Sequence, residues 1–155
     1  MVSFEIVQQS NSRLGSLPSG LVALFIGATK GIGESALQQF AQHAPSSRIY
    51  TVARPSAADS YETLLSELRL SNPTGSYKLI TADISLVAKV DKVVDAVKKQ
   101  ETKLDIVFVS VGFMPFEGRK LTSEGLEPSM STRYYSCFRE IEQLLLLLTK
   151  PPVHA

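Results

Sequence analysis

The chain has 155 residues, 44% of them hydrophobic, and its 16 lysines and arginines stand against 15 aspartates and glutamates, for a formal net charge of +1. A chain of this length and composition can bury a core, which excludes a globally disordered protein. The near-zero charge offers no basic surface to a nucleic acid or an anionic bilayer, so we expect neither as a partner.

Little in the sequence would direct the chain out of the cytoplasm. Its first residues lack the basic segment and apolar core of a secretion signal, and its longest leucine run, 144–148, is far shorter than the roughly 20 residues of a membrane span. The single cysteine, Cys137, cannot form an intrachain disulfide, and no cysteine–histidine cluster has metal-ligand spacing. We therefore expect a cytoplasmic protein without a metal site.

Strand-length and helix-length segments alternate along the chain. After a leader over residues 1–20, helical in part, apolar runs predict strands at 21–26, 48–52, 77–81 and 104–109. Apolar residues at helical spacing predict a helix after each strand: one up to Pro45, one over 58–70, one capped by Ser85, and one from Pro128 to about Thr149. We expect one domain with its core over 21–149 and a tail over 150–155.

This βαβαβαβα order predicts the fold class. Strands that alternate with helices of ten or more residues are joined by right-handed crossovers into a parallel sheet covered on both faces. The sequence therefore predicts an α/β protein with a Rossmann-like, doubly wound parallel sheet.

The most informative segment lies between the first predicted strand and the helix that follows it. Glycines at 27, 31 and 33 permit a tight turn and leave no side chain between the backbone and a diphosphate, toward which the helix directs its unpaired N–H groups. The segment predicts a dinucleotide-binding loop; the alternative is a turn with a structural role alone.

The spacing Gly-x-x-x-Gly-Ile-Gly resembles the fingerprint of the short-chain dehydrogenase/reductase (SDR) family, and the similarity covers roughly residues 21–150. Two further segments agree with that family: 82–84 (Ala-Asp-Ile) after the third strand, and 109–112 (Val-Ser-Val-Gly), where the family has Asn-Asn-Ala-Gly, although both asparagines are absent. The resemblance implies the N-terminal half of the family fold, with about four strands in the order 3-2-1-4, and an NAD(P) cofactor.

The loop and the resemblance together predict a set of cofactor-binding residues, in which the glycine loop holds the diphosphate, the aspartate meets the adenine amino group and the last glycine borders the ribose. The set is Gly27, Thr29, Lys30, Gly31, Ile32, Gly33, Arg54, Asp83, Ile84, Ser110 and Gly112. NAD-binding relatives carry a carboxylate near the end of strand two, whereas a 2′-phosphate needs cations. Lys30 and Arg54 therefore favour NADP(H) over NAD, unless both are merely solvated surface cations.

The catalytic residues of the resembled family are not found in the sequence. The family uses a Tyr-x-x-x-Lys pair further along the chain than the 43 residues that follow Gly112, and no tyrosine here has a lysine four places later. The nearest imitation, Tyr135 and Arg139, is better explained by packing or a salt link, because no third group orients the pair. We expect no catalytic residue and interpret the chain as a C-terminally truncated family member.

Several functions remain open. By family, the chain is an NADP-dependent oxidoreductase of a small carbonyl or alcohol in secondary metabolism, which is an argument from fold to function. On the same scaffold it could instead be a non-redox isomerase or cyclase, a cofactor-binding subunit for a partner, or an inactive truncated product.

The last predicted helix generates a prediction about association. An apolar stripe covers one side of it, and further leucines spread apolar surface around the rest; the residues are Tyr134, Phe138, Ile141, Leu145 and Leu148, then Leu144, Leu146 and Leu147. A helix that is apolar on most sides is normally buried on most sides, and in the resembled family the equivalent helices form a dimer interface. We predict a homo-oligomer, or a complex with another chain, formed through residues 134–148. Sedimentation of a dimer or larger species at micromolar concentration is the expected result, whereas a monomer that binds no hydrophobic dye would show that the helix only packs on its own sheet.

Overall fold

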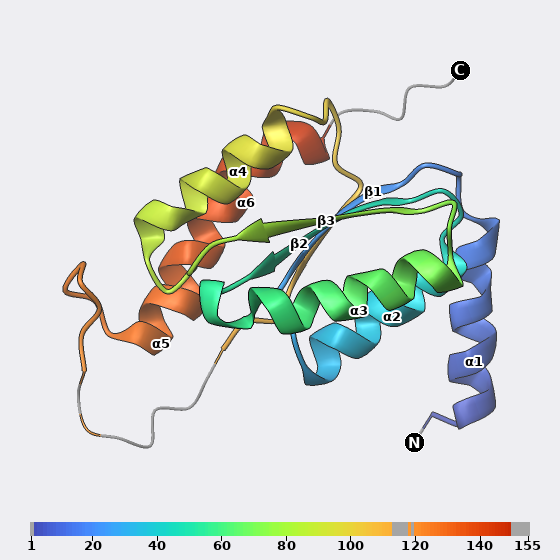
Figure 1. The fold of residues 1–155 in the computed structure, drawn as a ribbon, viewed down its shortest axis with the longest axis horizontal. Coiled ribbons are helices and arrows are strands. Elements are labelled where there is room, and N and C mark those ends of the chain that lie inside the picture. The colour runs from blue at the N-terminus through green and yellow to red at the C-terminus, as the bar shows by residue number, and fades with distance from the viewer. Residues whose placement is uncertain (1, 113–117, 119, 150–155) are drawn as a thin grey trace.

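The computed structural model describes residues 2–112, 118 and 120–149. Its four strands are β1 (Val22–Ile26), β2 (Arg48–Ala53), β3 (Ser76–Thr81) and β4 (Ile106–Val109). The longer helices are α1 (Phe4–Ser12), α2 (Gly31–His43), α3 (Ala58–Ser71), α4 (Val90–Lys98) and α6 (Cys137–Leu148). A short helix α5 (Pro128–Met130) and a π-helical segment (Ser131–Ser136) lead directly into α6, and we call residues 128–148 the rod (Figure 1).

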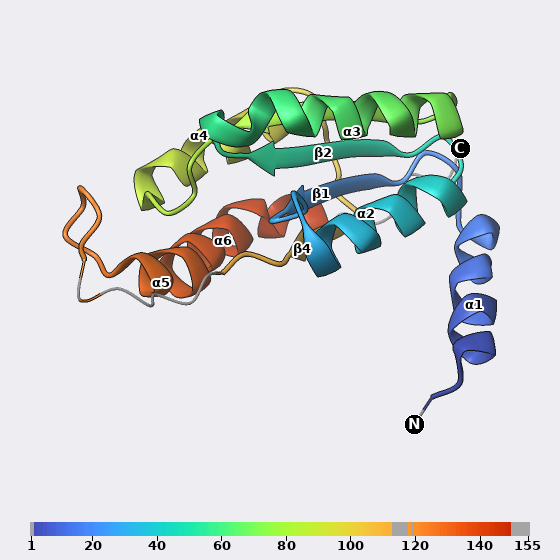
Figure 2. The same cartoon turned by 60° about the horizontal axis from the view of Figure 1, so that its bottom comes forward.

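The strands form one parallel sheet in the order β3-β2-β1-β4. Helices α2 and α3 cover one face, and α4 and the rod cover the other, as Figure 1 shows. Figure 2 shows β2 and β1 side by side in the turned view. The α/β fold class, the doubly wound sheet and the strand order predicted from the sequence are thus confirmed.

Strand β1 lies in the middle of this arrangement and contributes to both halves of the core. All five of its residues are buried. Val22, Leu24 and Ile26 pack with the valines of α4 on one face, while Ala23 and Phe25 pack with side chains of α2 and α3 on the other. A strand covered on both sides must be apolar at every position, which is why this segment shows no alternation.

Two predicted boundaries are wrong, and in both cases the residue expected at the boundary makes a different hydrogen bond. Strand β4 begins at Ile106 rather than residue 104, because the amide of Leu104 donates to the carbonyl of Leu147 in the rod at 3.0 Å. Ser85 does not cap the following helix. Its hydroxyl and amide both donate to Asp83, and α4 begins five residues later, after a 3₁₀ turn.

The rod is fixed to α4 by a polar cluster as well as by apolar packing. Arg139 donates through two nitrogens to the carboxylate of Asp91, each at 2.8 Å, and Gln143 donates to the same carboxylate at 2.7 Å. These donors hold the pKa of Asp91 at about 2. The salt link expected for Arg139 is therefore confirmed, whereas Tyr135 is exposed and its ring contacts that of Tyr134.

Most of the predicted apolar stripe lies on the outer side of the rod and is exposed to solvent. Tyr134, Phe138, Ile141 and Leu145 are 43–61% exposed, while Leu144 on the inner side is fully buried in the core. Self-association through this stripe stays a prediction.

Among the described residues, no helix combines the length and the apolar character that crossing a bilayer demands.

One buried residue of the rod conflicts with its surroundings. Glu140 is fully buried, and neither carboxylate oxygen has a hydrogen-bond partner within the described part of the chain. Removal from water penalises the charged form and raises the pKa of Glu140 to about 7. The folded protein therefore keeps Glu140 protonated over a pH range in which the unfolded chain has already lost this proton. The free energy of unfolding falls as the pH rises from about 4.5 to about 7.

We predict that Glu140→Leu removes this fall in the free energy of unfolding. The free energy of unfolding of the variant should exceed that of the parent by up to about 3 kcal/mol at pH 8, and by much less at pH 5, where the buried carboxyl is already protonated. Urea denaturation at both pH values measures the difference. Glu142→Gln, a change at an exposed position of the same helix, should alter neither value, and a gain that is equal at both pH values would contradict the explanation.

Candidate cofactor site

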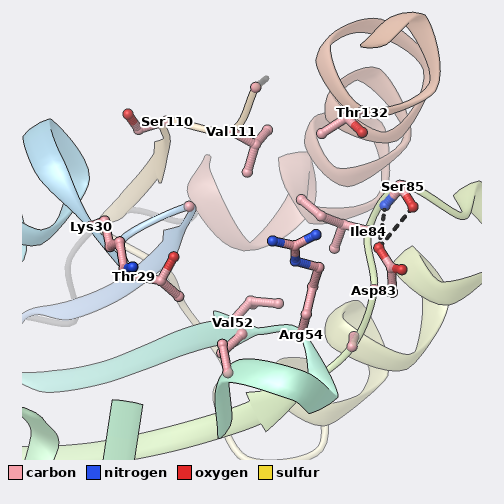
Figure 3. Close-up of a pocket in the computed structure, with 15 residues that line it drawn as sticks. Thr29, Lys30, Val52, Arg54, Asp83, Ile84, Ser85, Ser110, Val111 and Thr132 are labelled. Atoms are coloured by element: carbon pink, nitrogen blue, oxygen red, sulfur yellow. Dashed lines mark hydrogen bonds between the residues drawn. The ribbon is translucent and has the colours of Figure 1, made fainter. Parts of the chain in front are cut away.

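A pocket of about 310 Å³ opens at the carboxyl ends of the four strands. It lies where the strand order reverses, between β1 and β4, which is the position at which open α/β sheets bind their ligands. Eight of the eleven predicted cofactor-binding residues line it (Figure 3): Gly27, Thr29, Lys30, Arg54, Asp83, Ile84, Ser110 and Gly112.

The turn after β1 brings backbone against backbone at the floor of the pocket. Gly27 has a φ of +86°, and a Cβ atom at this position would lie 2.6 Å from the carbonyl carbon and oxygen of Ser110. Only glycine satisfies both the left-handed conformation and the close approach. The glycine loop and the end of β4 consequently form one continuous surface.

The three predicted residues that do not line the pocket lie in the first turn of α2. A Cβ atom at Gly33 would lie 2.3 Å from the carbonyl oxygen of Gly27, so the missing side chain lets the helix pack directly on the loop. Gly31 has a φ of +64° and open space around it, and the side chain of Ile32 is 81% exposed. Gly33 therefore does not line the pocket, but its close packing on Gly27 supports the loop that does.

The start of α2 presents positive potential to the pocket. Its N-cap residue, Lys30, has an extended backbone and makes no side-chain capping hydrogen bond. The first N–H groups of a helix have no partner within it and carry its partial positive charge, which attracts anions. Thr29 and Lys30 border the pocket beside this end of the helix.

A second cation reaches the same space from another strand. Arg54 follows β2 directly, and its guanidinium extends into the pocket toward Val111 (Figure 3). Within the described residues, neither Arg54 nor Lys30 is part of an ion pair with a carboxylate. Both positive charges are therefore available to an anionic ligand.

The opposite wall begins at the end of β3 and carries Asp83, the one acidic group among the described lining residues. Oδ1 of Asp83 accepts hydrogen bonds from the amide and the hydroxyl of Ser85, at 3.0 and 2.8 Å. These two bonds fix the carboxylate at the pocket edge (Figure 3).

Sequence reasoning missed seven further lining residues: Val52, Ala53, Ala57, Ala82, Ser85, Val111 and Thr132. Most of them are small or apolar and stand at strand ends, so the predicted strand boundaries could have suggested them. Thr132 comes from the rod, and nothing local in the sequence connects it with this pocket. The described lining residues include no tyrosine, histidine or cysteine, and Tyr135 and Arg139 do not line the pocket.

Other predicted features add nothing to this site. Within the described residues, no group of three or more histidine, cysteine, aspartate or glutamate side chains is placed to hold a metal ion. Cys137 lies half-buried in the rod, where burial and the neighbouring Glu140 raise the pKa of its thiol. A thiol with a raised pKa is a poor nucleophile at neutral pH.

Comparison with known proteins agrees with this geometry. A family model described as short chain dehydrogenase matches residues 21–151. The NmrA-like family domain-containing oxidoreductase notO of Aspergillus sp. (strain MF297-2) is 61% identical over 152 residues, which cover 98% of this chain and 46% of that protein. The chain thus spans about half the length of the curated relatives that it matches.

Solved structures show the same fold. The RhlG/NADP complex of Pseudomonas aeruginosa is 27% identical with a TM-score of 0.64, and L-sorbose reductase of Gluconobacter frateurii, solved with NADPH and L-sorbose, is 22% identical with a TM-score of 0.70. Each similarity covers 84% of this chain and 48% of the other.

The close contact at Gly33 leads to a prediction about stability. Gly33→Ala should lower the free energy of unfolding by about 1–3 kcal/mol, because its methyl group would overlap the Gly27 carbonyl and force the loop and the helix apart. Urea denaturation measures the change. Gly15→Ala is the matched control, since a Cβ atom there makes only an ordinary 3.7 Å contact; equal stabilities of the two variants would contradict the packing role.

Proposed function

Because the chain belongs to the short-chain dehydrogenase family, we propose that its pocket binds NADP(H) for an oxidoreductase reaction on a small carbonyl or alcohol. One observation carries the proposal. A glycine turn, a helix N-terminus and two cations, Lys30 after β1 and Arg54 after β2, converge on one pocket at the switch point of the sheet. The family binds nicotinamide cofactors, and the named relatives are oxidoreductases.

The pocket has the features that a dinucleotide needs. The backbone of the glycine loop is exposed to the pocket without intervening side chains, so phosphate oxygens can approach its N–H groups. In our proposal, residues of the loop and Lys30 hold the diphosphate. The small apolar side chains of Val52, Ala53 and Ala82 line the pocket together with Asp83, and in our proposal they contact the adenine ring.

Charge favours one of the two nicotinamide cofactors in this proposal. A 2′-phosphate is dianionic or nearly so, and it gains most from a guanidinium that can donate two hydrogen bonds to it. Arg54 stands at the end of β2, where NAD-specific proteins of this fold carry a carboxylate that would repel the phosphate. This favours NADP(H), and Ser110 and Gly112 then border the ribose on the nicotinamide side.

When bound, the nicotinamide ring supplies or accepts a hydride. The chain itself lacks the tyrosine and lysine pair that moves the accompanying proton in the resembled family. The described lining of the pocket also includes no tyrosine, which favours a second candidate function, in which these 155 residues bind the cofactor without supplying a proton donor of their own. Mixing the chain with NADPH and small ketones separates the two, because binding without NADPH consumption supports the second function and consumption supports the first.

The cofactor preference generates a direct test. Arg54→Ala should weaken NADPH binding by about 10- to 100-fold, since a hydrogen bond to a charged group contributes roughly 1.5–3 kcal/mol. The affinity for NADH, which has no 2′-phosphate, should stay within about twofold. Fluorescence titration with both cofactors measures the effect. Lys98→Ala, which removes an exposed cation from α4 away from the pocket, is the control; no NADPH binding to the parent chain, or equal losses for both cofactors, would refute the assignment.

A further inference from the structure

Two buried serine hydroxyls of the rod donate hydrogen bonds to the backbone of the pocket wall. Ser131 and Ser136 are both fully buried. The hydroxyl of Ser131 donates to the carbonyl oxygen of Ser85, and that of Ser136 donates to the carbonyl oxygen of Ile84, each at 2.6 Å. The two acceptors are consecutive residues of the pocket wall.

The π-helical segment explains how both hydroxyls reach that wall. The two serines are its first and last residues and stand five positions apart. In a regular α-helix each residue turns by about 100°, so residues five apart lie about 140° from each other around the axis. The wider π-helical turn, with its i→i+5 hydrogen bonds, brings them to a common side. Such insertions are frequent at functional sites.

The held carbonyls connect with the acidic group of the site. Ser85, whose carbonyl accepts from Ser131, also donates two hydrogen bonds to Asp83 through its amide and hydroxyl. The amide of Leu86 donates to the carbonyl oxygen of Asp83 at 3.1 Å, which closes the turn. The position of the Asp83 carboxylate is thus connected to the rod by an unbroken series of hydrogen bonds.

The segment just before the rod reinforces this attachment. Both oxygens of Glu124 accept backbone hydrogen bonds from the turn that follows the wall, from Val87 at 2.7 Å and from Ala88 at 2.9 Å. Thr132, between the two serines, lines the pocket itself (Figure 3). The wall at the end of β3 is therefore held at several points from one side, by residues 36 to 52 positions away in the sequence.

We propose that Ser131 and Ser136 are positioning residues, which set the segment 83–85 and with it the adenine-side wall of the pocket. The inference deepens the proposed function and rests on it for the identity of the ligand. If the wall moved away from the rod, each of these carbonyl oxygens would lose its hydroxyl donor and remain buried without a partner, which costs free energy. The two hydrogen bonds therefore restrict the wall to one position.

The test uses the full chain with both serines replaced by alanine. Calorimetric titration with 2′,5′-ADP, which carries the adenine and the 2′-phosphate without nicotinamide, should show affinity weakened about tenfold. Amide hydrogen exchange of the ligand-free protein should be faster by about tenfold at Ser85 and Leu86, beyond any uniform change. If the double variant does not fold, Ser131→Ala alone is measured in the same way.

Thr51→Val serves as the control for general loss of stability. Thr51 is fully buried in β2, and its hydroxyl donates to the carbonyl oxygen of Lys78 at 3.3 Å, outside the pocket. The control should change neither the affinity nor the local exchange. Equal losses in the control and the serine variant, or exchange at Ser85 and Leu86 unchanged by the serine replacements, would overturn the inference.

The two readouts also separate this inference from the proposed function. A parent chain that does not bind 2′,5′-ADP overturns NADP(H) binding, whereas the exchange rates still decide whether the serines hold the wall. Binding to the parent, with affinity unaltered in the serine variant, refutes the positioning role alone.

Discussion

The backbone contact between Gly27 and Ser110 is the constraint on which the site depends. It joins the turn after β1 to the end of β4 at a distance that excludes any side chain. The contact sets the floor of the pocket, and the packing of Gly33 behind it fixes where α2 begins and where its unpaired N–H groups point. An anion-binding helix end is common in proteins; here the close backbone packing determines that it faces a pocket.

The rod combines two roles that place opposite demands on it. Its inner side is part of the core through Leu144 and Leu147, and it also carries the polar groups that reach Asp91 and the pocket wall. Its outer side exposes aromatic and aliphatic side chains to solvent. Exposed apolar surface of this kind usually marks a contact with another chain or segment, so stability, the shape of the pocket and the predicted association all involve one continuous element.

Glu140 shows that the inner side of the rod is not optimised for stability alone. A fully buried carboxyl group without a hydrogen-bond partner among the described residues opposes folding at neutral pH, when it must either lose its charge or be buried with it. The polar residues around it, Ser136 and Arg139, are satisfied by Ile84 and Asp91 respectively. The rod thus contains both fully satisfied polar contacts and one unsatisfied group within two turns.

The sequence by itself determined the layers and most of the glycine loop, and its resemblance to the family supplied the strand order that the structure shows. Continuous apolar runs, helical spacing and the three glycines are local patterns, and each reflects a local requirement: burial on both faces, one apolar stripe, or freedom from a side chain. Arg54 could also be predicted, because a cation directly after β2 lies at the carboxyl edge of the sheet, whereas Asp83 was predicted from the resemblance of residues 82–84 to the family.

Only the tertiary structure decided which residues complete the wall of the pocket and where α4 and β4 begin. Thr132, Ser131 and Ser136 reach the end of β3 across more than 40 residues of chain, and a π-helical turn with no clear sequence signal aims them there. Leu104 bonds to Leu147, 43 residues further along the chain, instead of continuing the strand. Ser85 bonds to its near neighbour Asp83 instead of capping α4. Contacts between distant segments depend on how helices pack on the sheet, and no local pattern contains that information.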